Sequence, residues 1–171
     1  MKLAVVTSTI RGDIDTLISN TAAMLQARGK RLSGVAKVLQ DEPEGSHECD
    51  MDLRVLPDGP IIRITQSLGE GSDSCRLNPV AITEAVAAVE QNDVESCDMF
   101  ILNKFGPQEA EGHGFCDAIG SALEHGVPVL VGVGEGTREA FDAFADGMAE
   151  TLPPDADAIA KWCLEAVGEK V

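Results

Sequence analysis

The sequence predicts one α/β domain, spanning residues 1–171, in which a mostly parallel sheet carries helices on both faces. Segments with a strand-like pattern alternate with segments whose apolar residues recur at helical spacing. Two strand-like segments, residues 98–103 and 127–133, are continuous apolar runs, which is the pattern of strands buried on both faces. The length of 171 residues and the 44% of apolar residues suit a single substantial core.

Each expected element follows from its own pattern and its terminal residues. Gly29 ends the first helix, Asp58-Gly59 is a hairpin turn signal, Pro79 suits the first turn of a helix and Asp155 is a suitable N-cap. In order, we expect a strand at 2–6, a helix at 14–28, a strand at 32–39, an acid-rich loop at 40–50, an inserted β-hairpin at 51–66, a loop at 67–78, a helix at 79–90, a strand at 98–103, a loop at 104–114, a helix at 115–124, a strand at 127–133, and helices at 138–148 and 156–167, the last within the C-terminal segment 155–168.

The charge balance limits the possible partners. Thirteen Lys and Arg residues against 29 Asp and Glu residues leave a formal charge of −16, which repels nucleic-acid backbones and anionic lipid surfaces. The first apolar run is too short for a signal peptide, and no run is long enough to span a bilayer, so we expect a cytoplasmic protein. The five cysteines form no Cys-x-x-Cys pair, which favours reduced thiols.

Several motifs together carry a resemblance to known families. Residues 5–13, the hairpin, residues 99–109 and residues 125–129 resemble, in this order, segments of the small P-loop nucleoside triphosphatases near the adenylate-kinase-like proteins. The motifs Cys-Asp-Met-Asp-Leu at 49–53, Cys-Arg-Leu-Asn at 75–78 and Asn-Lys-Phe-Gly…Glu-Ala-Glu-Gly at 103–112 look like an uncharacterised bacterial family whose members are often encoded beside molybdate-transport genes. The resemblance implies a three-layer P-loop fold.

The residues that hydrolyse nucleotides in P-loop proteins are replaced in this sequence. A working loop reads GxxxxGK[ST], because its lysine reaches the phosphates and its hydroxyl holds magnesium. Here Gly12 remains, but Asp13 stands at the lysine position. Asn103 and Lys104 stand where the resemblance places two metal-binding acids. We therefore expect no efficient phosphoryl transfer and predict that the protein is not a hydrolase.

The remaining residues favour the binding of a small anion, with molybdate and a nucleotide phosphate as candidates. A loop that ends on a helix N-terminus attracts anions, and Lys104 would lie at the carboxyl edge of the same sheet. In the alternative interpretation, Asp13 is a plain helix cap and Arg11 a solvent-exposed residue. The candidate ligand-binding residues are Thr7, Ser8, Thr9, Arg11, Gly12, Asp13, Asp50, Asp52, Cys75, Arg76, Asn103, Lys104, Gly106, Glu109 and Glu111.

Two other functions stay open at this point. A weak triphosphatase or phosphotransferase would use Lys104 and Glu109 in unfamiliar roles. A metal or redox module would use Cys49 and Cys75, although the spacing His47-x-Cys49 is not a paired ligand motif. The oligomeric state is also open, and a homo-oligomer is compatible with the sequence.

Overall fold

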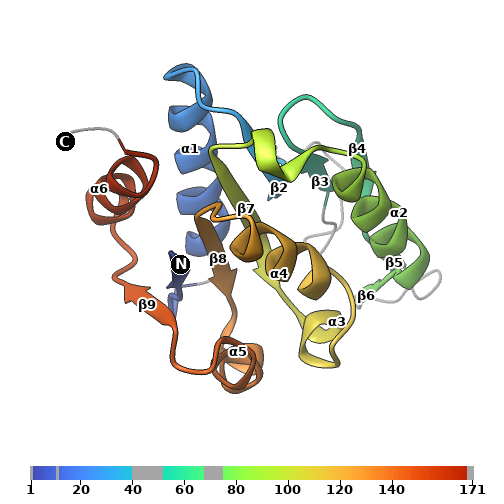
Figure 1. The fold of residues 1–171 in the computed structure, drawn as a ribbon. Helices are drawn as coiled ribbons and strands as arrows, with labels where there is room; N and C mark the ends of the chain where they lie inside the picture. Colours follow the sequence, from blue (N-terminus) through green and yellow to red (C-terminus); the bar gives the residue numbers. More distant parts are fainter. Residues whose placement is uncertain (1, 11, 40–51, 68–74, 169–171) are drawn as a thin grey trace.

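The computed structural model describes residues 2–10, 12–39, 52–67 and 75–168 of the chain. The described residues form a seven-stranded sheet with the strand order β4-β3-β2-β7-β8-β1-β9 (Figure 1). Its strands are β1 (Leu3–Val6), β2 (Leu32–Lys37), β3 (Asp52–Val55), β4 (Ile61–Arg63), β7 (Met99–Phe105), β8 (Val129–Val133) and β9 (Ala149–Leu152). The block β2-β7-β8-β1-β9 is parallel, and the hairpin β3-β4 extends it in antiparallel fashion.

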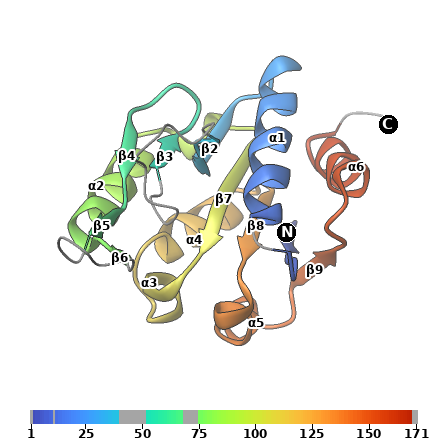
Figure 2. The same ribbon diagram turned by 180° about the vertical axis from the view of Figure 1, so that it is seen from behind.

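Helices cover both faces of the sheet, which confirms the expected α/β architecture. Helices α1 (Asp13–Ala27) and α6 (Ala156–Ala166) lie on one face, and α2 (Pro79–Glu90) and α4 (Cys116–Glu124) lie on the other (Figures 1 and 2). Helix α5 (Arg138–Ala145) joins the second layer through Phe141. In the part of the chain that the structure describes, no helix is both long and apolar enough to cross a bilayer.

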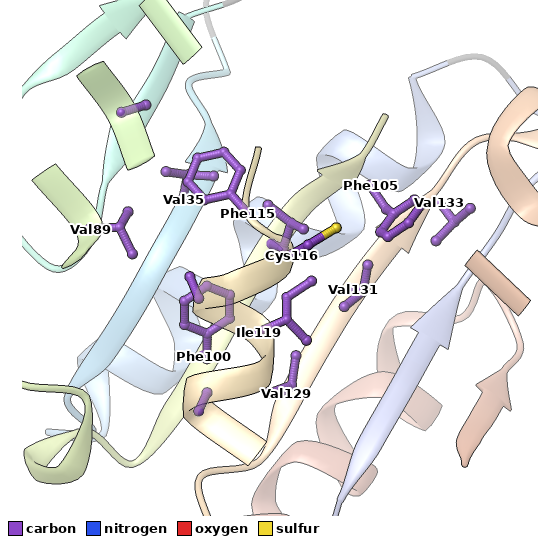
Figure 3. Packing of buried hydrophobic residues seen from close by; sticks show 14 of the residues in the cluster. Val35, Val89, Phe100, Phe105, Phe115, Cys116, Ile119, Val129, Val131 and Val133 are labelled. Carbon is purple, nitrogen blue, oxygen red and sulfur yellow. The ribbon is translucent and has the colours of Figure 1, made fainter. Parts of the chain in front are cut away.

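The alternating side chains of the buried strands supply two separate cores. In β1, Val5 packs with the α2–α4 layer, whereas Ala4 and Val6 pack with α1 and α6. Figure 3 shows the first of these cores, in which Phe100 of β7 and Phe115, at the start of α4, belong to the layer between the sheet and this helix. The continuous apolar runs of the two central strands exist because both of their faces need apolar side chains.

The structure corrects several expected boundaries. The hairpin forms, but residues 65–67 leave it as β5 (Thr65–Ser67) and pair with β6 (Cys75–Leu77), where the sequence predicts a loop. The helix expected at 138–148 ends at Ala145, because Asp146 and Gly147 adopt left-handed backbone conformations. The next residues form the edge strand β9, which the sequence analysis missed.

The expected loop at 104–114 is also only partly a loop. Strand β7 continues to Phe105, and the short helix α3 (Pro107–Ala110) follows directly. Two predicted caps are confirmed: Pro79 lies in the first turn of α2, and the Asp155 carboxylate accepts a hydrogen bond from the Ala158 N–H at 3.0 Å.

Gly34 allows β2 and β7 to approach each other at the centre of the sheet. Its φ of 101° lies in the left-handed region, and a Cβ atom placed on it would lie 1.9 Å from the backbone oxygen of Ile101. A backbone atom cannot move aside as a flexible side chain can, so only glycine fits this position.

We expect Gly34→Ala to lower the free energy of unfolding by about 3 kcal/mol or more, because strands β2 and β7 must separate and the residue must adopt a strained φ. Urea denaturation followed by fluorescence of Trp162, the only tryptophan, measures this loss. The matched control is Gly120→Ala in α4, where no atom lies within 4 Å of the added Cβ and a gain of up to about 1 kcal/mol is expected. Equal midpoints for the two variants would contradict the packing argument.

Candidate functional site

The first loop joins β1 to α1 and leaves the helix start without a side-chain cap, although the Asp13 N–H donates to the Ile10 backbone oxygen at 3.2 Å. Gly12 takes a φ of 79° at the N-cap position, and no side chain of the described residues caps the helix. The Ser8 hydroxyl donates to the Asp13 carboxylate at 2.7 Å and accepts from the Ile10 N–H at 3.1 Å. Asp13 is the first residue of the helix, and its side chain is hydrogen-bonded to the preceding loop. Gly12, and not Asp13, occupies the N-cap position.

Asp15 fastens the first turn of α1 to two strand ends. Its carboxylate accepts from the Lys37 ammonium at the end of β2 and from the Asn103 amide in β7, each at 3.1 Å. Asn103 is fully buried, and its Oδ1 is the only buried side-chain polar atom without a partner among the described residues. The amide thus joins α1 directly to the strand position where the resemblance places a metal-binding acid.

A hollow of about 240 Å³ opens over this loop, and we call it the α1 hollow. Its lining residues are Ser8, Thr9, Ile10, Gly12, Ile14, Asp15, Lys104, Gly134 and Glu135. The Lys104 ammonium lies 3.9 Å from the position that a Cβ of Gly134 would occupy, and Gly134 is itself a lining residue of the hollow. Within the described residues, no hydrogen bond or ion pair engages Lys104, whose side chain is exposed.

The charges around the α1 hollow are mixed. Asp15 is compensated by Lys37 through their 3.1 Å ion pair. The exposed Glu135 lines the hollow together with Lys104, and Asp13 is the first residue of α1, between the lining residues Gly12 and Ile14. A ligand at this place therefore meets one exposed ammonium and open helix N–H groups, next to carboxylates that oppose highly charged anions.

Glu109 lies in a different environment from the open loop that the sequence suggests. It is 6% exposed, and burial raises the pKa of its carboxyl group against the opposing effect of the backbone N–H groups of Glu109, Gly106 and Phe115. Gly114 makes room for it, since a Cβ there would lie 2.8 Å from the carboxyl carbon. The Cys116 thiol donates to the Glu109 backbone oxygen at 3.2 Å, and burial raises the pKa of this thiol to about 11.

A second, smaller cavity of about 50 Å³ lies beside Glu109, and we call it the α3 pocket. Its lining residues are Leu53, Ile64, Leu77, Ile82, Lys104, Gly106, Pro107, Glu109 and Phe115. Glu109 and Gly106 thus line the α3 pocket and not the α1 hollow, whereas Lys104 lines both cavities.

The remaining predicted site residues are dispersed. Asp52 forms an ion pair with Arg63 at 2.9 Å inside the hairpin, and Glu111 is exposed after α3. Thr7 follows β1 but does not line the α1 hollow. Arg11, Cys49 and Asp50 lie outside the described residues, and Cys75 and Arg76 are described only as backbone of β6.

No support for the metal alternative comes from the part of the chain that is described. Those residues contain no group of three or more His, Cys, Asp or Glu side chains arranged to hold a metal ion. The described cysteines Cys97, Cys116 and Cys163 are free thiols.

The sequence analysis missed three charged residues of the site, Asp15, Lys37 and Glu135, together with the uncharged lining residues Ile10, Ile14 and Gly134. Asp15 lies two positions after the aspartate that replaces the loop lysine, and a charged residue in a first helical turn is too common to signal a role. Lys37 could have been predicted from its position at the end of β2. The carboxyl ends of parallel strands meet at one edge of the sheet, so Lys37 was expected near the end of β7.

Comparisons with known proteins bear on the fold and the family of this chain. The molybdenum import ATP-binding protein ModC 2 of Bradyrhizobium diazoefficiens is 34% identical over 152 residues, which cover 88% of this chain but only 17% of that protein. The solution structure of a human cancer-related nucleoside triphosphatase has a TM-score of 0.61, at 15% sequence identity, and the match covers 88% of this chain and 87% of that one.

The structural match confirms the predicted P-loop triphosphatase-like fold, and the match to the ModC protein shows a relation to one segment of a protein named as ATP-binding. Residues 3–162 match the family described as "Protein of unknown function (DUF2478)", and the chain therefore belongs to this family.

Proposed function

We propose that this domain binds a small anion, or the phosphate of a nucleotide, without hydrolysing it. The observation that carries the proposal is the exposed ammonium of Lys104, which shares the α1 hollow with the uncapped start of α1. The first N–H groups of a helix have no partner within the helix, and together with the helix dipole they attract negative charge. Lys104 adds a full positive charge to this partial one.

The position of this charge differs from that in a hydrolytic P-loop. There the cation follows the loop glycine and the acid ends a central strand. Here the carboxylate of Asp13 follows Gly12, and the cation Lys104 is the penultimate residue of β7. The positive charge at this site therefore comes from a strand residue, Lys104, and not from the loop. Because Lys104 lines the same hollow as the loop, this arrangement favours retained anion binding.

The link between Asp15 and Asn103 argues against metal-dependent hydrolysis. Magnesium in P-loop proteins needs a carboxylate at a strand end and a hydroxyl at the helix start. In this chain the strand supplies the amide of Asn103, and the helix position after Asp13 is Ile14. The carboxylate of Asp15, which is the one next to Asn103, accepts a 3.1 Å hydrogen bond from its amide and a second one from Lys37.

A role beside molybdate transport is the biological part of the proposal. The relative named for molybdenum import carries a segment similar to this chain in 17% of its length, so most of that protein lies outside the match. We propose that the matched segment is an accessory binding domain, and that this chain performs the same task. Molybdate, tungstate and nucleotides are then the ligands to compare.

Lys104→Met should weaken anion binding about 10- to 100-fold, because one charge-assisted hydrogen bond contributes about 1.5–3 kcal/mol. Isothermal titration calorimetry with molybdate, tungstate, sulfate, phosphate and ATP measures the affinities. Lys161→Met removes the same charge from an exposed position on α6 and should leave them unchanged. The proposal fails if none of the five anions gives heat or a thermal shift with the unaltered protein.

Asn103→Asp should lower the free energy of unfolding by about 2–3 kcal/mol at pH 7, because a second carboxylate would face Asp15 in a buried position. Chemical denaturation at pH 7 and pH 5 measures the loss, which should shrink at pH 5 as the introduced carboxyl takes up a proton.

Asn103→Leu serves as the control for this variant, because it removes the amide and adds no charge. Both variants and the unaltered protein should release phosphate from magnesium-ATP no faster than buffer does. Magnesium-dependent hydrolysis that appears in the unaltered protein, and is lost with Lys104→Met, would instead establish the enzyme that the sequence leaves open.

A further inference from the structure

The two cavities at the carboxyl edge of the sheet share one residue. Lys104 lines the α1 hollow, whose wall residue Ile14 belongs to the core under α1, and also the α3 pocket, whose residues Ile82 and Phe115 belong to the core under α2 and α4. The side chain of Lys104, the penultimate residue of β7, therefore lies between a polar site on one layer and an apolar site on the other.

The chemistry of the α3 pocket is that of a small-molecule subsite. Leu53, Ile64, Leu77, Ile82 and Phe115 give it apolar walls. Ligand sites typically combine such walls with a small number of polar groups that fix the orientation. The polar side chains here are the ammonium-bearing Lys104 and the buried carboxyl group of Glu109.

The positions of these two groups orient a ligand. The Lys104 ammonium lies beside Gly134, a residue that lines the α1 hollow, so positive charge is offered on that side. Glu109 is 6% exposed and lines the α3 pocket, where burial beside its carboxyl group disfavours a second negative charge. An anionic group is therefore favoured at the Lys104 end and an uncharged group inside the pocket.

The size of the pocket limits the uncharged group. A volume of about 50 Å³ holds roughly four groups the size of a water molecule. A short alkyl chain or a comparable fragment fits, while an oxyanion such as molybdate has no apolar part to place there.

We propose that the ligand is an amphiphilic anion, whose phosphate or carboxylate group binds between Lys104 and the start of α1 and whose short apolar body fills the α3 pocket. This inference rests on the proposed function, because it uses the same anion site. It goes further in naming the class of ligand and in assigning Leu77, Ile82 and Phe115 to its recognition.

Calorimetry with inorganic phosphate and with methyl, ethyl, propyl and butyl phosphate tests the inference. The affinity should rise about fourfold for each methylene that enters the pocket and then level off when the pocket is full. Leu77→Phe fills part of the pocket from a partly buried position and should flatten the series, while the affinity for inorganic phosphate stays the same. Val80→Phe, at a neighbouring residue that is 67% exposed, should retain the full series.

The outcomes separate the two proposals. If inorganic phosphate binds in a Lys104-dependent manner and the series is flat in the unaltered protein, the amphiphilic ligand is excluded and anion binding stands. The same exclusion follows if Leu77→Phe weakens inorganic phosphate as much as the esters. If neither inorganic phosphate nor any ester binds, the anion site itself is refuted, and the inference with it.

Discussion

The seating of the first turn of α1 on the ends of β7 and β8 is the constraint on which the rest of the site depends. Gly132 in β8 lacks a side chain, and a Cβ there would lie 2.6 Å from the Cγ2 atom of Ile14, so the helix rests almost on the strand. Asp15 then bonds to the ends of β2 and β7 on the same turn. Because helix and strand ends are fixed to each other, the loop before α1 and the residue after Asn103 have set positions, and the α1 hollow lies between them.

Much of the fold could be predicted from the sequence, because the central strands and the amphipathic helices have distinct apolar patterns. The buried strands β7 and β8 and the turn at Asp58-Gly59 are local signals of this kind. Strands β6 and β9 were missed for a physical reason. They have three and four residues, too few for a period. Their pairing partners make them strands: β5 for β6, and β1, at the other end of the chain, for β9.

The residues of the site likewise divide into those that the sequence could indicate and those that it could not. Gly12, Asp13 and Lys104 could be selected in advance, since their residue types depart from a known motif at known positions. The bond between Asp15 and Asn103 joins residues 88 positions apart, and nothing in either local sequence indicates it. Glu109 illustrates the opposite error: a glutamate among glycines and polar residues suggests an open loop, yet the left-handed Gly114 folds the chain over it.

The carboxylates around Lys104 have a consequence for selectivity. With a net charge of −16, the protein's field opposes the approach of any anion, and the repulsion grows with the charge that the anion carries. Lys104 attracts only at short range, where the carboxylate of Glu135, which lines the same hollow, offsets part of its effect. The electrostatic potential at the mouth of the hollow therefore discriminates between anions according to their charge. Between two anions of equal size, the singly charged one, or the one whose charge is masked by a bound cation, enters faster.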